Sequence, residues 1–186
     1  MINKKSNPTK LLWLDLEMTG LEPQKDLILE IALIVTDFNF DILDTYQTNI
    51  RHPKATVVNR MQANSWWQDY PKNRDMFVNN LESGKELVVA EKEIIKIINK
   101  NFNNEPVILA GNSIYNDRLF IKQWMENLET KLHYRMLDVS AWKVLMQGKY
   151  NTELKKPEIH RAFDDIKGSI AELQYYIDWF SQYDGS

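Results

Sequence analysis

An apolar run of strand length, LLWLDL, begins at Leu11 and leads into two acids. Because successive side chains of a strand point to opposite faces of a sheet, three leucines of this run share one face, whereas Trp13, Asp15 and Glu17 share the other. Two neighbouring carboxylates disfavour each other's ionised form, and a divalent cation bound by their oxygens offsets that cost. The pattern indicates either a strand that presents a metal site or a strand end with two solvated acids.

Two more strands are predicted directly after this one. Residues 27–37, LILEIALIVTD, are rich in aliphatic and β-branched side chains, and residues 42–50 form a more polar run. Residues 38–41, FNFD, separate the two runs by the length of a hairpin turn. The chain is therefore predicted to open with a three-stranded antiparallel unit.

The remaining pattern alternates helices with short strands. In residues 86–101 apolar side chains recur at the spacing of an amphipathic helix. A helix over residues 114–128 is predicted to begin after Asn112 or Ser113, either of which can cap it. Further helices are predicted at residues 55–67, 73–81, 139–146 and 162–180, further strands at residues 106–110 and 134–137, and a polar connection at residues 148–159.

This order of elements predicts an α/β fold with a mixed β-sheet of about five strands, the first three antiparallel, flanked by helices. No internal repeat, low-complexity segment or linker divides the sequence. Residues 1–186 are therefore predicted to form a single domain, with residues 1–10 as a flexible N-terminal segment.

The composition favours a cytoplasmic protein with a sizeable core. Of the 186 residues, 44% are hydrophobic and 11% are aromatic, which is too apolar for a disordered chain. The absence of cysteine excludes disulfides and cysteine-based metal sites. The N-terminus lacks the apolar segment of a secretory signal, and the longest apolar run, residues 27–35, contains Glu30 and is too short to cross a bilayer.

The charge of the chain limits the kind of nucleic acid that it could bind. The formal net charge is −3, and lysines and arginines form no long run. Affinity for long nucleic acids depends on neutralised phosphates. Any nucleic-acid substrate is therefore expected to be short, or to be held by metal ions and a few specific contacts.

Three residues farther along the chain could join the first two acids. Asp117 falls in the first turn of the predicted helix 114–128, where it either complements the helix dipole or lies at a strand end that gathers ligands. His160 and Asp165 are five residues apart, about 140° around a helix, and so would not share a helical face. His160 is therefore predicted to lie on the loop before the helix 162–180, and Asp165 in its early turns.

His160 is the best candidate for a general base among the three histidines, since His52 precedes a proline in a loop and His133 abuts a predicted strand. A histidine with a pKa of about 6.5 can accept a proton from water at neutral pH. Together with a base, four acids predict phosphodiester hydrolysis in which two metal ions, about 3.5–4 Å apart, hold the attacking and leaving oxygens. The four acids are Asp15, Glu17, Asp117 and Asp165.

Four blocks of the sequence resemble the oligoribonucleases, 3′-to-5′ exoribonucleases of the DEDDh group with a ribonuclease-H-like fold. The blocks are LDLEMTGL, GNSIYNDR, HYRMLDVS and HRAFDDIKGSIAELQYY, in that order along the chain. The resemblance implies that the four acids bind two Mg²⁺ or Mn²⁺ ions and that His160 activates the attacking water. It also implies a homodimer that degrades very short RNA, especially dinucleotides, to nucleoside 5′-monophosphates.

The same resemblance implies contacts with substrate. Leu21 matches a residue that wedges between two bases, and Trp66 matches one on which a base stacks. Tyr134 matches a tyrosine that enters the active site from the partner protomer. Each of these could instead be structural, with Leu21 and Trp66 in the core and Tyr134 packing a strand. The positions that match a cap on the substrate's 5′ phosphate are Ser113, which could also be a helix cap, Arg135 and Ser140.

The sequence departs from the family pattern at a few positions near these contacts. Pro71, with Tyr70 beside it, stands where the family usually has a histidine, and Ala141 stands where it commonly has Ser or Thr. The adjacent Trp66 and Trp67 leave two possible alignments of the stacking residue.

Two alternative functions remain. One is a proofreading-type DEDDh exonuclease on DNA 3′ ends, against which the HYR sequence and the lack of basic tracks argue. The other is a catalytically silent module that binds RNA ends, against which the presence of all five catalytic positions argues.

Overall fold

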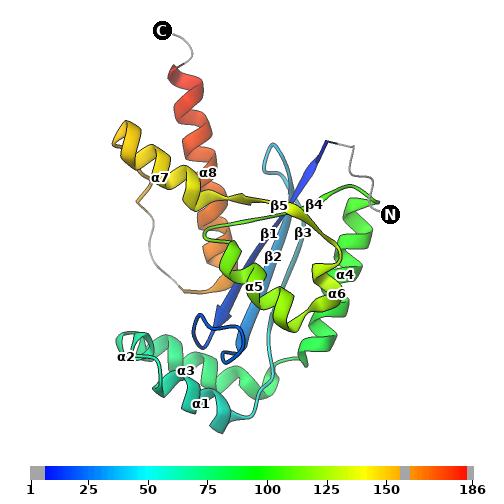
Figure 1. The fold of residues 1–186 in the computed structure, drawn as a ribbon, viewed down its shortest axis with the longest axis vertical. Helices are drawn as coiled ribbons and strands as arrows, with labels where there is room; N and C mark the ends of the chain where they lie inside the picture. The colour runs from blue at the N-terminus through cyan, green and yellow to red at the C-terminus, as the bar shows by residue number, and fades with distance from the viewer. Residues whose placement is uncertain (1–6, 156–159, 184–186) are drawn as a thin grey trace.

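The computed structural model describes residues 7–155 and 160–183, and it is built around a five-stranded sheet in the order β3-β2-β1-β4-β5 (Figure 1). Strands β1, β2 and β3 are antiparallel, and β4 and β5 add in parallel to β1. The predicted mixed sheet with three antiparallel strands first is therefore confirmed. The strands are β1 (Lys10–Met18), β2 (Ile28–Asp37), β3 (Ile42–Asn49), β4 (Val107–Gly111) and β5 (Leu132–Asp138).

Helices cover both faces of the sheet, and a separate helical group lies at one end of it (Figure 1). Helices α4, α5 and α6 pack on one face, α7 and α8 on the other, and α1 to α3 form the separate group. The bounds are α1 (Lys54–Gln62), α2 (Trp66–Asp69), α3 (Pro71–Asn80), α4 (Leu87–Phe102), α5 (Tyr115–Trp124), α6 (Glu126–Glu129), α7 (Val139–Tyr150) and α8 (Ala162–Tyr183), with a 3₁₀ turn at Leu81–Ser83.

The alternation in β1 decides which helices its two faces meet. Leu12 and Leu14 are buried among α4, α5 and α6, whereas Leu11 and Trp13 are buried among α7 and α8. Since Asp15 has the parity of Trp13, strand alternation turns the acids of β1 toward α8. The predicted division of faces is confirmed.

The predicted helix 55–67 is wrong in its middle, where the structure has two helices. The chain leaves α1 at Ala63, and α2 starts at Trp66. The side chain of Asn64 accepts a hydrogen bond from the Trp66 N–H at 3.1 Å and donates one to the Thr19 carbonyl at 3.1 Å. Such local side-chain bonds compete with helical ones, and they break the helix here.

The predicted helix 114–128 is also divided, and its predicted cap is wrong. Met125, fully buried in the core, has φ −133° and ψ 61°, which separates α5 from α6. The cap position of α5 is Ile114, whose side chain forms no capping bond. Ser113, with φ 48°, turns its hydroxyl toward Ser140, and Asn112 donates to Ser169 of α8.

Other predicted boundaries move by a few residues. Helix α3 begins at Pro71, β5 extends over seven residues, and α7 runs on to Tyr150. Strand β1 begins at Lys10, and most of the predicted flexible segment 1–10 lies outside the described residues, as does part of the connection 148–159. No helix in the described part of the chain has the length and apolar character needed to cross a membrane.

Candidate active site

Three carboxylates meet where β1 leaves the sheet and α8 begins. Asp15 and Glu17 come from β1, and Asp165 comes from the first turn of α8. One carboxylate oxygen from each residue lies within 4.8 Å of those of the other two. Strand alternation and the position of a helix start thus bring together acids that are about 150 residues apart in sequence.

The electrostatics of this cluster leave negative charge unbalanced. Burial first, and neighbouring acids after it, raise the pKa of the Asp15 carboxyl well above its ordinary range and together raise the pKa of Glu17 to about 8. The guanidinium of Arg161 lowers the pKa of Glu17, but by less than these effects raise it. Because carboxylate oxygens are the preferred ligands of Mg²⁺ and Mn²⁺, this donor set fits a divalent ion.

Asp117 lies beside this cluster without belonging to its tightest group. It is buried in the first turn of α5, and its Oδ1 accepts a hydrogen bond from the Leu16 N–H at 2.9 Å. Burial raises the pKa of Asp117 to about 7. Among neighbouring charges, Asp117 has the largest effect on the pKa of Asp15. The fourth predicted acid therefore faces the same site from the end of β4.

A hollow of about 360 Å³ opens in front of the three carboxylates, and Leu21, Trp66 and His160 help to line it. Leu21 is 72% exposed, so it is not a core residue. Its loop is fixed by Asp26, which accepts hydrogen bonds from the Thr19 hydroxyl and the Glu22 N–H at 2.8 and 2.9 Å. The loop thus presents a leucine to solvent on a well-anchored backbone.

The two adjacent tryptophans have different environments. Trp67 is 1% exposed and donates from its indole nitrogen to the Thr19 carbonyl at 2.9 Å, so it belongs to the core. Trp66 is half-buried on the wall of the hollow, where its ring stacks on Tyr70 at 4.3 Å between centroids. Trp66 is therefore the more accessible of the two rings, which favours it as the residue on which a base stacks. Pro71 forms the first residue of α3, and Tyr70, the cap residue before it, packs against Trp66 and His160.

His160 lies on the loop before α8, as predicted, and its imidazole meets two aromatic rings. Its ring packs edge-on against Trp66 and Tyr70, at 5.0 and 4.6 Å between centroids. The other histidines are held elsewhere, since His52 contacts the Ile28 carbonyl at 2.7 Å and His133 accepts from the Arg135 N–H at 3.1 Å.

The predicted phosphate-capping residues are only partly brought together. The hydroxyls of Ser113 and Ser140 lie 3.1 Å apart, and Asp138 accepts hydrogen bonds from the backbone N–H groups of both. Arg135 lies on the edge strand β5, with its guanidinium 5.4 Å from the centroid of the Tyr134 ring. Tyr134 is 65% exposed and does not line the hollow of the acidic cluster.

Sequence reasoning missed several residues that support the site. Tyr70 packs on His160, Asn73 donates to the His160 carbonyl at 3.2 Å, and Glu30 binds Arg161. Only Glu30 carries a signal in the sequence, because an acid inside a long apolar strand requires a buried partner. The others become neighbours of the site only through tertiary packing.

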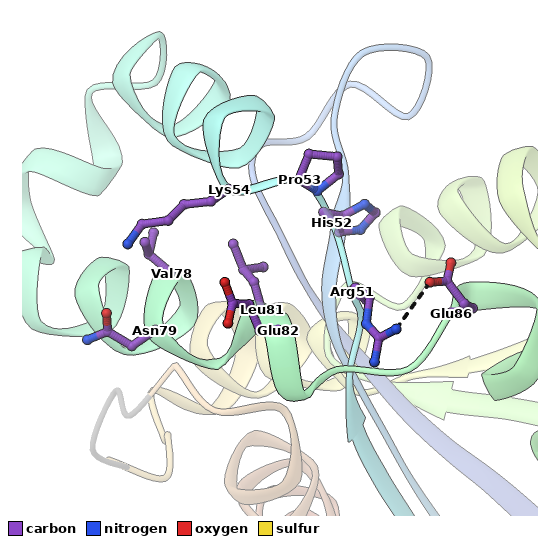
Figure 2. Close-up of a pocket in the computed structure, with 9 residues that line it drawn as sticks. All are labelled: Arg51, His52, Pro53, Lys54, Val78, Asn79, Leu81, Glu82 and Glu86. Carbon is purple, nitrogen blue, oxygen red and sulfur yellow. Dashed lines mark ion pairs between the residues drawn. The ribbon is translucent and has the colours of Figure 1, made fainter.

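A second hollow, of about 690 Å³, lies at the N-terminal end of α1 and the C-terminal end of α3 (Figure 2). The hollow of the acidic cluster lies toward the other ends of these helices. Arg51, Lys54, Glu82 and Glu86 are among its lining residues, and Arg51 pairs with Glu86 at 3.7 Å. Both partners of that pair are more than half exposed. Cations and carboxylates thus alternate here, and the described residues that line it include no group of three acids.

Comparison with known proteins gives consistent matches. The profile of the exonuclease family RNase_T matches residues 12–173. A probable oligoribonuclease of Caenorhabditis elegans is 38% identical over 170 residues, covering 90% of this chain and 86% of the relative. The oligoribonuclease of Photorhabdus laumondii is 38% identical over 177 residues, covering 92% of this chain and 96% of the relative.

A solved structure shares the fold at much lower identity. E. coli exonuclease I, in complex with a 5cy-dA13 oligonucleotide, superposes with a TM-score of 0.58 at 12% identity. The match covers 94% of this chain and 43% of that protein, so this chain spans less than half of its length.

Proposed function

The chain belongs to the RNase_T exonuclease family and is a 3′-to-5′ exoribonuclease of the oligoribonuclease type, and we propose that its substrates are very short RNAs, especially dinucleotides. The products are nucleoside 5′-monophosphates. The observation that carries the proposal is the convergence of Asp15, Glu17 and Asp165 within 4.8 Å, in a hollow that His160 also lines.

The four acids, Asp117 included, hold two divalent ions, Mg²⁺ or Mn²⁺, in this proposal. When bound, such ions stabilise charge on the attacking and leaving oxygens of a phosphodiester. The rigid strand β1 and the first turn of α8 fix the carboxylates, so little reorganisation is needed to bind cations. The raised pKa of Glu17, about 8, means that cation binding releases a proton near neutral pH.

His160 acts as the general base and accepts a proton from the attacking water. Its loop position beside the acids lets the imidazole approach that water without itself being a ligand. Packing against Trp66 and Tyr70 limits the rotation of the ring, and an oriented base is more effective than a mobile one.

Two sets of contacts, one with the bases and one with the 5′ phosphate, limit the length of the RNA that the site accepts. Leu21 separates two bases and Trp66 stacks on one of them, an interaction that tolerates any base. Ser113, Ser140 and Arg135 contact the 5′ phosphate, which closes the site to a longer strand. The net charge of −3 supports this view, because no basic track is available to hold long RNA.

Product analysis on 5′-labelled RNAs of two to seven nucleotides, with and without EDTA, tests the proposal. We expect a 5′-phosphorylated dinucleotide to be hydrolysed fastest and EDTA to stop the reaction. A deoxyribose dinucleotide distinguishes RNA from DNA as the substrate. Equal efficiency on the heptamer would contradict the phosphate cap, and faster hydrolysis of the DNA would favour the DNA exonuclease alternative.

A homodimer in the cytoplasm completes the proposal, with Tyr134 reaching into the partner's site. The exposure of Tyr134 on an edge strand supports this role. If it holds, Tyr134→Ala and Asp15→Ala chains are each inactive, but a mixed dimer contains one complete site. Refolding the two variants together should then restore about a quarter of wild-type activity for random pairing. Continued inactivity of a heterodimer verified by native mass spectrometry would exclude the cross-subunit role.

A further inference from the structure

We propose that Glu30 and Arg161, which form an ion pair between β2 and the start of α8, are positioning residues for His160. The inference rests on the proposed function of His160 as general base. The ion pair itself touches neither substrate nor water in this proposal. It acts by fixing the backbone from which the imidazole projects.

The Glu30 carboxylate is almost entirely enclosed, since the residue is 1% exposed within an apolar strand. Its two oxygens accept hydrogen bonds from Arg161 Nη2 at 2.8 Å and Nε at 3.2 Å, and from Gln47 Nε2 at 2.6 Å. A buried carboxylate is costly unless it is paired and hydrogen-bonded. Apolar residues often replace such buried ion pairs without loss of stability. Stability alone therefore does not account for a buried ion pair at this position, and the geometry that the pair imposes is a second reason for it.

The ion pair links a residue beside the acidic cluster to a residue beside the base. Glu30 stands directly opposite Glu17 in the β1–β2 register, so both side chains project from the same face of the sheet. Arg161 is the next residue after His160. The two-pronged contact therefore ties β2, the hydrogen-bonded neighbour of the strand that carries the acids, to the residue that follows the base.

The backbone of His160 requires such support. Its φ of 53° lies in the left-handed region, which is unfavourable for residues other than glycine and persists only where the surroundings enforce it. Asn73 donates to the His160 carbonyl at 3.2 Å, and the Ala162 N–H donates to Glu30 at 3.4 Å. Contacts at the His160 carbonyl and at the two residues that follow it thus hold the strained conformation, and Glu30 accepts the hydrogen bonds of Arg161 and Ala162.

A double-mutant cycle distinguishes positioning from a general structural role. The double variant Glu30→Gln/Arg161→Met removes both charges and keeps similar side-chain volumes. We expect kcat on a 5′-phosphorylated dinucleotide to fall about tenfold to a hundredfold, as for a small misplacement of a catalytic group. We expect KM and the affinity for Mn²⁺ alone, measured by calorimetry, to stay within about twofold. In a His160→Ala background the same two substitutions should change kcat by less than about twofold, because residues that act through one group are not additive.

Arg161→Lys is the second variant, since it keeps the charge but loses the two-pronged contact. It enters the same cycle if the double variant does not fold. Arg51→Met, which breaks the exposed Arg51–Glu86 pair, is the matched control and should leave kcat unchanged. An equal loss of kcat in both backgrounds, or a loss of Mn²⁺ affinity, would overturn the positioning role while the role of His160 stands. If His160→Ala itself leaves kcat unchanged, the proposed base is wrong and the positioning role fails with it.

Discussion

The two hollows at opposite ends of α1 and α3 differ in how their charges are balanced. The hollow of about 690 Å³ has alternating cations and carboxylates that solvent can reach, with Arg51 and Glu86 paired at its rim. The hollow of about 360 Å³ has three carboxylates held within 4.8 Å of one another by a strand and a helix. Surface ion pairs contribute little energy, whereas crowded, half-buried acids favour a bound cation. Cavity size is therefore a poor guide to the active site, and the unbalanced charge is a good one.

Removing an acid from the smaller hollow should have the largest effect. We expect Asp15→Ala to lower kcat by about 10⁴-fold or more, because metal-assisted charge stabilisation amounts to several kcal/mol and each 1.36 kcal/mol is tenfold in rate. Lys54→Met in the larger hollow should leave kcat unchanged. The measurement is single-turnover hydrolysis of a labelled dinucleotide by folded protein. Full activity of the Asp15 variant, or of the wild type in excess EDTA, would remove the distinction between the two hollows.

Loss of the base should be large but should not affect cation binding. We expect His160→Ala to lower kcat by about 10²–10⁴-fold, the usual contribution of a general base. Calorimetric titration with Mn²⁺ should give nearly the wild-type affinity. His52→Ala, which changes a histidine of the larger hollow, is the control. Weakened Mn²⁺ binding in the His160 variant would indicate a ligand rather than a base.

The aromatic wall of the smaller hollow should affect KM more than kcat. Since base stacking contributes about 1–3 kcal/mol, Trp66→Ala should raise KM for a dinucleotide about 5- to 150-fold. Trp67→Phe loses the indole bond to Thr19 in the core, so it should lower the melting temperature and leave KM nearly unchanged. The opposite result, with KM raised only in the Trp67 variant, would reverse the assignment of the two tryptophans.

The smallest expected effect is on the pH dependence of stability without metal. The pKa of the Glu17 carboxyl rises from 4.5 to about 8 on folding. Between these values the folded protein keeps a proton that the unfolded chain has lost, so stability falls as pH increases. From pH 5 to pH 8 the melting temperature should therefore fall several degrees more in the wild type than in Glu17→Gln.

Added Mn²⁺ should raise the melting temperature more at pH 8 than at pH 5, because its ligands must be deprotonated. Glu86→Gln, in the larger hollow, should show the wild-type pH dependence. A wild-type curve that matches that of Glu17→Gln would show that Glu17 keeps an ordinary pKa in the folded protein.

Much of this site follows from local rules. The parity of β1 predicts that Asp15 and Glu17 share a face, and the five-residue spacing predicts that His160 precedes the helix that carries Asp165. The structure agrees with both. The errors lie where side chains compete with the helix, as Asn64 does by accepting a hydrogen bond from the Trp66 N–H, or where packing bends the chain, as at the buried Met125.

The sequence by itself determined the order of the elements, the mixed sheet and the faces of its strands, because these depend on the periodicity of neighbouring residues. Only the tertiary structure decided which distant residues meet. It pairs Glu30 with Arg161, stacks Tyr70 on Trp66, and separates a half-buried Trp66 from a fully buried Trp67. These contacts depend on the angles at which loops and helices pack on the sheet. Such angles result from the summed packing of the whole core, which no local pattern in the sequence contains.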